Sequence, residues 1–290
     1  LPLSEIFDDK DIDFIHAKAA RLNRENKTIT TAGGETIAFD TLVLALGVQT
    51  NYFGIKGLET YSYGIKTLRD AEKLKAHLHQ QLIEENRPDL NYIVIGGGPT
   101  GVELAGTLPS YLKKICKQHG IKRRRINIEL VEAAPRLLPR MPKDFSRTVA
   151  RRLRRLGTKL YFNSKVKAQT DDSLIVNDRR IDSQTVIWTA GVTNSSFFTE
   201  NGFQLASSGK VRVNQLLQAE RDIYVIGDNA DTPYSGLAQT AIQDGRYVAS
   251  SLKSVADNKE PEPYAAKEPV YVIPCGPRWA AVLWGKVRVY

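Results

Sequence analysis

A glycine-rich turn between an apolar strand and a helix places the strongest constraint on this chain. The run "IVIGGGPTGVELAG" covers residues 93–106, and its glycines have the spacing G-x-G-x-x-G. The first glycine permits a sharp turn, the second lets a pyrophosphate approach, and the third lets helix and strand pack closely. The helix start also offers free N–H groups and partial positive charge to phosphates. We expect a dinucleotide site at Gly96, Gly98, Pro99, Thr100 and Gly101, the alternative being a purely structural turn.

An acidic residue ends the next expected strand. Glu132 follows the apolar run 126–131, and a carboxylate at that strand tip accepts hydrogen bonds from the adenosine ribose hydroxyls. Its distance from the glycine turn exceeds the usual spacing of about 20 residues, and we assign the excess to the basic segment 113–125. The acidic tip favours NADH over NADPH, and Arg136 works against that preference.

Length and composition limit the class of protein. A chain of 290 residues suggests two domains, and 42% hydrophobic content is enough for sizeable cores. No apolar run approaches the roughly 18–20 residues of a membrane span, and the acidic N-terminus does not resemble a signal peptide. Cys116 and Cys275 form neither a CxxC pair nor a metal-binding spacing, so we expect no metal site, buried thiols and a reducing compartment.

The positive charge is concentrated in two segments. The formal charge is +9, and the basic residues gather in 113–125 and 151–155. We consider three explanations for these basic segments, in decreasing order of preference: a solvated helix face, a surface that binds anionic lipid, and a surface that binds nucleic acid. Nucleic acid comes last because no nucleic-acid motif is present and aromatic residues are not interleaved with the basic ones.

Hydrophobic periodicity predicts alternating strands and helices, typical of an α/β fold. A hairpin is expected with Gly33-Gly34 at its bend, and His77 and His79 are expected at the surface of a polar helix. Residues 257–269 have the composition of a linker, and the tail after it resembles strands cut off in progress. The expected strands are 41–47, 92–95, 126–132, 159–169, 173–177, 185–191 and 222–228, and the expected helices are 68–86, 100–117, 144–156 and 236–254.

Six motifs in order give the chain a family resemblance over about residues 1–255. They are "ALGVQTNYFG", "GGGPTGVELAG", "VEAAPRLLP", "VIWTAGV", "IYVIGD" and "AQTAIQDG". The sequence resembles the two-dinucleotide flavoprotein reductases, and within them the type II, or alternative, NADH dehydrogenases. The resemblance implies a Rossmann-like NADH domain with a parallel sheet, inserted into a partial FAD-binding α/β domain, together with a three-stranded antiparallel β-meander.

The domain boundaries follow from this resemblance. Residues 1–75 and 193–257 are expected to form the FAD domain, 76–192 the NADH domain, and 258–290 the start of a C-terminal region. The family's FAD domain opens with its own G-x-G-x-x-G, and none precedes Gly96 here. We therefore expect a chain that begins partway through the FAD domain and is cut in its C-terminal region.

The resemblance also assigns residues to the cofactors. The turn Ala45-Leu46-Gly47 is similar to an Ala-Thr-Gly turn beside the flavin nucleotide, with Leu46 in place of the threonine. Asp228, after Gly227, resembles an aspartate that binds the flavin ribityl chain, the alternative being a turn former or helix cap. Ala190-Gly191 resembles a turn that approaches the nucleotides, whereas Trp188 is expected in the core.

Three residues receive roles at the reacting centre through the same resemblance. Glu103, in the first turn of the glycine-loop helix, resembles a glutamate near the nicotinamide and flavin; a carboxylate complementing the helix dipole is the alternative. Gln239 and Gln243, with Ala238, resemble the Ala-Gln-x-x-x-Gln signature against the flavin ring and the quinone site. Their spacing puts both amides on one helix face, which an ordinary polar helix face would also explain.

The implied function is an FAD-dependent, non-proton-pumping NADH:quinone oxidoreductase. Hydride passes from NADH to flavin, and two electrons then pass to a membrane quinone. The family is peripheral, so the resemblance implies a respiratory enzyme at the cytoplasmic face of an anionic membrane, with the homodimer left open. Two alternatives remain: a soluble NAD(P)H reductase of the disulfide, peroxide or ferredoxin type, and a non-catalytic NADH-binding module.

Overall fold

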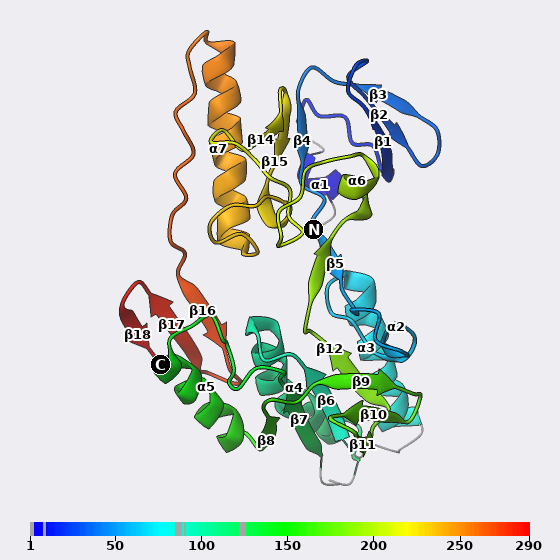
Figure 1. Cartoon of the computed structure of the whole chain (residues 1–290). Helices are drawn as coiled ribbons and strands as arrows, with labels where there is room; N and C mark the ends of the chain where they lie inside the picture. Colours follow the sequence, from blue (N-terminus) through cyan, green and yellow to red (C-terminus); the bar gives the residue numbers. More distant parts are fainter. Residues whose placement is uncertain (1–2, 8–9, 85–88, 90, 122–125) are drawn as a thin grey trace. The chain divides into compact units, whose positions relative to one another are not determined.

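The chain forms two compact units (Figure 1). The computed structural model describes residues 3–7, 10–84, 89, 91–121 and 126–290, so the expected basic residues 122–125 lie outside this description. Unit 1 comprises residues 1–48 and 194–267, and unit 2 comprises 49–193 and 268–290. Residues 49–193 of unit 2 are thus inserted into the sequence of unit 1, and residues 268–290 at the end of the chain again belong to unit 2.

Unit 2 is built on a four-stranded parallel sheet with the order β12-β6-β7-β8. The central strand β6 is almost wholly buried, as expected for a parallel sheet covered on both faces. From β6 the chain continues to β7 and β8 on one side, whereas β12 lies on the other side of β6. The strand order therefore reverses beside β6, and α/β sheets bind ligands at such a switch point. The strands are β6 (Asn91–Ile95), β7 (Asn127–Val131), β8 (Thr158–Tyr161) and β12 (Thr185–Trp188).

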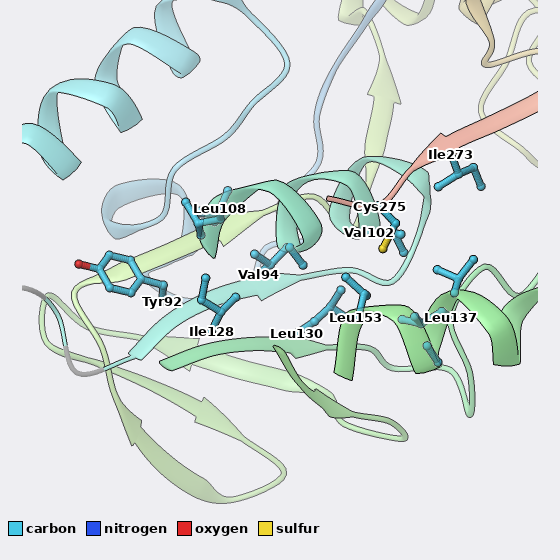
Figure 2. Close-up of a cluster of buried hydrophobic side chains, with 14 of the residues drawn as sticks. Tyr92, Val94, Val102, Leu108, Ile128, Leu130, Leu137, Leu153, Ile273 and Cys275 are labelled. Atoms are coloured by element: carbon cyan, nitrogen blue, oxygen red, sulfur yellow. The ribbon is translucent and has the colours of Figure 1, made fainter. Parts of the chain in front are cut away.

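Helices α4 (Pro99–Gln118) and α5 (Lys143–Arg155) pack with this sheet. Figure 2 shows the resulting core, in which Val94 and Leu130 of the sheet meet Val102 of α4 and Leu153 of α5. Helix α3 (Leu68–His79) begins with a Thr67 capping box and continues into the π-helix η1 (Gln80–Glu84). The predicted helices of this unit and its predicted strands other than 159–169 are present, with bounds that differ by a few residues; positions 85–86 of the predicted helix 68–86 lie outside the described residues.

An antiparallel meander covers another part of the sheet in unit 2. Its strands are β9 (Val166–Gln169), β10 (Ser173–Val176) and β11 (Arg179–Asp182), and they share a core with Ile93 and Trp188. The predicted continuous strand 159–169 is wrong. The chain leaves the parallel sheet after Tyr161 and turns at Asn163, which has a φ of 51°, before β9 begins.

The C-terminal residues form an antiparallel sheet of their own. Strands β16 (Tyr271–Pro274), β17 (Ala280–Trp284) and β18 (Val287–Val289) are consecutive and pair in that order. Cys275 lies in the core with α4 (Figure 2). The Arg152 guanidinium of α5 donates to the Cys275 carbonyl at 3.2 Å.

Unit 1 contains two three-stranded sheets. The first is the antiparallel β1-β2-β3, which includes the predicted hairpin, and Gly34 at its bend has a φ of 90°. The second has the order β14-β15-β4, with β15 and β4 parallel. The elements are α1 (Leu3–Phe7), β1 (Ala19–Asn23), β2 (Thr28–Thr31), β3 (Thr36–Ala38), β4 (Leu42–Leu44), α6 (Ser196–Glu200), β14 (Gln218–Glu220), β15 (Ile223–Val225), η2 (Gly227–Asn229) and α7 (Ala238–Ala256).

Three short elements complete the description of the chain. Strands β5 (Val48–Thr50) and β13 (Val192–Asn194) pair with each other, and α2 (Leu58–Tyr61) contacts β9. Across the described residues, no helix combines the length and the apolar character that crossing a bilayer requires.

His77 is half-buried rather than a plain surface residue. Its ring stacks on Tyr63 with the centroids 4.6 Å apart, and its Nε2 lies 2.9 Å from the Thr185 hydroxyl. His79 is also half-buried, with Nε2 3.4 Å from the Tyr111 hydroxyl. No cluster that could hold a metal occurs in the part of the chain that is described.

Replacing Gly106 by alanine should weaken the attachment of the C-terminal sheet to α4. The added methyl would lie 2.7 Å from the backbone nitrogen of Gly276, and such overpacking costs about 1–3 kcal/mol of unfolding free energy. Urea unfolding followed by tryptophan fluorescence should show a lower midpoint, because all three tryptophans lie in unit 2.

Gly245→Ala in α7 is the matched control for this substitution. A Cβ at Gly245 would meet no atom within 4 Å, and alanine in a helix interior is favoured over glycine by roughly 0.5–1 kcal/mol. Circular dichroism should show unchanged or higher stability for this variant. An unchanged midpoint for Gly106→Ala would contradict the tight contact between α4 and the C-terminal sheet.

Candidate functional site

Packing within unit 2 requires two of the three glycines that define the G-x-G-x-x-G pattern after β6. Gly96 has a φ of 110°, and a Cβ there would lie 2.8 Å from the Ala190 Cα. A Cβ on Gly101 would lie 1.9 Å from the Gly96 carbonyl oxygen. The turn therefore lies against the 189–191 segment that follows β12, as expected where two neighbouring parallel strands end.

Gly98 has no such packing reason to be glycine. Its φ is −74°, which any residue can adopt, and a Cβ there would meet no protein atom within 4 Å. The open side of this residue is where the G-x-G-x-x-G turn admits a pyrophosphate. Gly98 also caps α4 without a side-chain hydrogen bond, Pro99 follows it, and Pro99 and Thr100 are exposed, so the helix start is available to an anion.

Glu132 lies at the tip of β7 and holds the glycine turn. Its Oε2 accepts a hydrogen bond from the Gly97 N–H at 2.5 Å, and its Oε1 accepts one from the Ala134 N–H at 2.6 Å. Each carboxylate oxygen keeps a second lone pair, so the half-buried side chain can still receive ribose hydroxyls. This placement fits an adenosine ribose beside the turn.

Arg136 is engaged by the protein backbone. Its guanidinium donates to the carbonyls of Pro139 and Met141 at 2.5 and 2.8 Å, and to the Leu138 carbonyl at 3.1 Å. These bonds shape the loop after β7. Arg136, which weakened the predicted preference for NADH, thus uses its guanidinium to bind this loop.

In the predicted nucleotide turn Ala190-Gly191, Ala190 is exposed and Gly191 is tightly packed in unit 2. A Cβ on Gly191 would lie 2.5 Å from the Phe53 ring, and the Gly191 carbonyl accepts from the Asn51 N–H at 3.0 Å. Trp188 is buried, as predicted, and its indole N–H donates to the Asn51 carbonyl at 2.7 Å. Thr189, which the motifs did not single out, donates its hydroxyl to the Ile95 carbonyl at 2.7 Å and so joins the ends of β12 and β6.

Glu103 is the fifth residue of α4, one position beyond the first turn in which the sequence placed it, so that placement is wrong. The side chain is half-buried, and burial raises the pKa of its carboxyl group. A carboxylate with a raised pKa beside a nucleotide turn is a candidate for a functional group. Its contribution to the site remains a prediction.

In unit 1, the ends of β4 and β15 carry the predicted flavin turns. The two turns are joined by Asn229, a buried residue that the motifs did not identify. Its side-chain amide accepts from the Gly47 N–H at 2.9 Å and donates to the Gly47 carbonyl at 2.6 Å. Gly47 has a φ of 65°, which suits glycine. Ala45 and Leu46 stay exposed, Leu46 to 41% although its side chain is apolar.

The Gly227-Asp228 turn is held from both sides of its backbone. The Gly227 N–H donates to Asp244 Oδ2 at 2.9 Å, and the Gly227 carbonyl accepts from the Ser235 hydroxyl at 2.8 Å. Asp228 is half-buried beside it. Asp244 is a second residue that sequence reasoning missed, since its position in the "AQTAIQDG" motif gave no reason to separate it from the glutamines.

The two glutamines of α7 differ in their surroundings. Ala238 and Gln239 are exposed in the first turn of the helix. Gln243 is half-buried, and its amide group donates to the Ala265 carbonyl at 2.9 Å and accepts from the Lys267 N–H at 3.3 Å. The expected i, i+4 spacing of the two glutamines on α7 is present, and their roles at the flavin and the quinone remain predictions.

These residues fit the cofactors of a two-nucleotide oxidoreductase. The open side of Gly98 gives a pyrophosphate room beside the backbone, and the position of Glu132 suits an adenosine ribose. The turns at Gly47 and Gly227 leave exposed groups at two adjacent strand ends, as a flavin nucleotide requires. The sequence contains no second G-x-G-x-x-G before Gly96, so the fit to FAD concerns these two turns and Asp228.

Comparison with known proteins gives a family match over most of the chain. A model of the family described as pyridine nucleotide-disulphide oxidoreductase matches residues 5–245. A type II NADH:quinone oxidoreductase of Staphylococcus saprophyticus is 28% identical over 277 residues, covering 89% of this chain and 68% of that protein. The Staphylococcus aureus protein of the same name is 26% identical over 282 residues, covering 91% of this chain and 70% of that protein.

Solved structures share the fold at lower identity. NDH2 from Plasmodium falciparum in complex with NADH has a TM-score of 0.80 at 17% identity, with 95% of this chain and 76% of that chain covered. A NAD-dependent persulfide reductase from A. fulgidus has a TM-score of 0.79 at 18% identity, with 96% of this chain and 51% of that chain covered. Both matches concern the fold.

The glycines of the turn should separate binding from folding. Gly98→Ala should leave unfolding by urea unchanged, because the methyl meets no protein atom, and should weaken NADH binding by about tenfold or more, since it fills the space for the pyrophosphate. Gly101→Ala should lower the urea midpoint of unit 2, because its methyl would overlap the Gly96 carbonyl. Calorimetric titration with NADH checks the first variant, and normal NADH affinity would contradict the assignment of Gly98.

The raised pKa of Glu103 predicts a pH-dependent effect on stability. A carboxyl group with a raised folded-state pKa binds its proton more tightly in the folded protein, so its ionisation lowers stability. The wild-type protein should therefore become less stable than Glu103→Gln as pH rises above the ordinary carboxyl pKa of about 4.3. Urea midpoints by tryptophan fluorescence should favour the variant near pH 7, with the gap closing in acid; a gap independent of pH would contradict the effect of burial.

Proposed function

We propose that this chain, which belongs to the pyridine nucleotide-disulphide oxidoreductase family, transfers electrons from NADH through FAD to a quinone. The family match makes the chain an oxidoreductase, and the cofactors of its family are FAD and a pyridine nucleotide. The observation that carries the proposal is Gly98, a glycine that neither backbone conformation nor packing requires, at the start of an uncapped helix. The relatives named as NADH:quinone oxidoreductases support the choice of donor and acceptor.

Unit 2 is the proposed NADH domain. The backbone N–H groups at the start of α4 would bind the pyrophosphate, with Gly98 leaving the space for it. Glu132 would accept the ribose hydroxyls, and a 2′-phosphate would meet its negative charge, which favours NADH over NADPH. Pro99 and Thr100 border the phosphates, and Ala190-Gly191 closes the turn beside them. Glu103 would lie near the reacting end of the nucleotide.

Unit 1 is the proposed FAD domain. Asp228 would accept hydrogen bonds from the ribityl chain, and the Ala45-Leu46-Gly47 turn would lie along the flavin nucleotide. Bound FAD supplies the chemistry that accepts a hydride and releases two electrons. The protein binds and orients the two nucleotides, and no side chain needs to act as a nucleophile.

Helix α7 is the proposed contact with the electron acceptor. Gln239 is exposed near its start, and its amide can donate to and accept from a quinone carbonyl or a flavin carbonyl edge. Gln243 lies one helical turn further along and is partly engaged by the segment after the helix. Ala238 leaves room beside both residues.

The cysteines give no support to a disulfide or persulfide acceptor. Both thiols are free and buried, and burial raises the pKa of Cys275 to about 11. A thiol with that pKa carries almost no thiolate near neutral pH, and the thiolate is the reactive form. A quinone acceptor requires no reactive thiol, which is consistent with two buried cysteines.

The proposed location is the surface of an anionic membrane. Four basic residues of α5 are exposed at four-residue spacing, which places them on one face of the helix. Each Lys or Arg near an anionic bilayer contributes about 1 kcal/mol of attraction. A peripheral enzyme at the cytoplasmic face, with a homodimer as one of its states, fits a respiratory quinone reductase. These residues are Lys143, Arg147, Arg151 and Arg155.

Gln239→Ala tests the quinone assignment. The reconstituted variant should lose about tenfold or more in kcat/KM for a short-chain quinone, because an amide that binds the acceptor is removed. Its rate with ferricyanide, which needs no such site, should stay within about twofold.

Arg246→Ala is the matched control, since Arg246 is exposed on the same helix and has no proposed role. It should leave both rates unchanged. Equal losses with quinone and ferricyanide for Gln239→Ala would contradict a quinone contact on α7.

A further inference from the structure

The segment that follows α7 is fastened along that helix by side chains. Residues 258–267, here called the strap, contain no helix or strand and run back beside α7 in Figure 1. The Tyr247 hydroxyl donates to the Glu262 carbonyl at 2.8 Å, and the Gln243 amide donates to the Ala265 carbonyl at 2.9 Å. The strap is therefore held at several points by one face of the helix.

Tyr264 is the point where the strap enters the interior of unit 1. Its N–H donates to the Gln215 carbonyl at 2.7 Å, and its ring packs edge-on against Tyr247 with the centroids 5.1 Å apart. The ring belongs to a small apolar cluster with Val248 and Leu217. From there the Tyr264 hydroxyl reaches Asp244 Oδ1 at 2.6 Å.

Asp244 connects the strap to the predicted flavin turn. The residue is fully buried, one carboxylate oxygen accepts from Tyr264, and the other accepts from the Gly227 N–H at 2.9 Å. In the described part of the chain it forms no ion pair within 4.0 Å with a basic side chain. A buried carboxylate without a cation relies on its hydrogen-bond donors, so the bonds from the strap and from the turn support the same charge.

We infer that Tyr264 and Asp244 are positioning residues that couple the docking of the strap to the conformation of the Gly227-Asp228 turn, and through it to the affinity for FAD. The inference rests on the proposed function, because it takes Asp228 as a flavin contact. Without the Tyr264 hydroxyl, Asp244 keeps the Gly227 N–H as a hydrogen-bond donor. The position of the Asp244 carboxylate, and with it the hydrogen bond to Gly227, then changes. Coupling of this kind is reciprocal, so bound FAD should in turn hold the strap more firmly.

Two tyrosine variants of the full chain separate this coupling from simple tethering. Tyr264→Phe removes the bond to Asp244 and keeps the ring in its cluster. Tyr247→Phe removes a bond to the strap backbone and leaves Asp244 untouched. FAD affinity is measured by quenching of flavin fluorescence, and amide hydrogen exchange is followed in peptides covering 226–231, the strap and, as an internal reference, residues 19–31.

We expect Tyr264→Phe to weaken FAD binding about tenfold, as loss of one hydrogen bond to a charged group does, and to raise exchange at 226–231. Tyr247→Phe should change FAD affinity by less than about twofold while raising exchange in the strap. Saturating FAD should slow exchange of the strap in the wild-type protein and have a smaller effect in Tyr264→Phe. Exchange at 19–31 should stay constant, which separates a local effect from loss of the fold.

Two results would overturn the inference, and the exchange at 226–231 keeps it testable even if FAD does not bind. Equal strap exchange in both variants, with FAD affinity and exchange at 226–231 unchanged, would make Tyr264 a tether only. If the wild-type protein bound no FAD, the proposed function would fail, and exchange at 226–231 without ligand would still decide the coupling. A rise there in Tyr264→Phe but not in Tyr247→Phe supports it, and no rise contradicts it.

Discussion

Backbone N–H groups that leave the end of a β-strand lose their partners in the sheet, and the turns of this protein depend on how those groups are satisfied. Buried amides without partners are costly. Here each turn of interest receives a side-chain acceptor from elsewhere in its own unit: Glu132 for Gly97, Asn229 for Gly47 and Asp244 for Gly227. The turns are thereby fixed before any ligand arrives, and a preorganised site loses less free energy to ordering when it binds.

This arrangement explains which parts of the site could be predicted from the sequence. The roles of Gly96 and Gly101 follow from local geometry, because a strand, a tight turn and a helix can meet in few ways, and the structure confirms that packing needs both glycines. Glu132 could be placed at a strand tip for the same reason. The alternation of strands and helices was predictable from hydrophobic periodicity, whereas the parallel sheet and the meander were implied by the family resemblance.

Residues that act across long sequence separations left no comparable signal. Asn229 and Gly47 are 182 residues apart, and a single buried asparagine has no pattern that predicts such a contact. The strand predicted at 159–169 failed because Asn163 adopts a left-handed turn that hydrophobicity does not report. The packing of the C-terminal sheet against α4 also left no signal in the sequence, because it depends on the close contact between Gly106 and Gly276 in the folded unit.

The glutamines of α7 show that a motif can predict the spacing of two residues without predicting their surroundings. The motif predicted their spacing, and the helix confirms it, yet Gln239 is exposed whereas Gln243 binds the backbone of the strap. Proteins with this fold include a named persulfide reductase as well as NDH2, so the fold leaves the acceptor open. In the proposed function, the acceptor contact lies on α7 and the donor binds at the turn after β6.

The central claim, that this chain binds both nucleotides and passes hydride between them, is tested most directly by visible absorption spectroscopy. The purified chain is incubated with FAD, freed of unbound cofactor and mixed with NADH in the absence of oxygen. The account predicts flavin absorption bands that remain with the protein and bleach on addition of NADH. Protein that binds NADH but retains no flavin bands, or bands that NADH leaves unchanged, would contradict it.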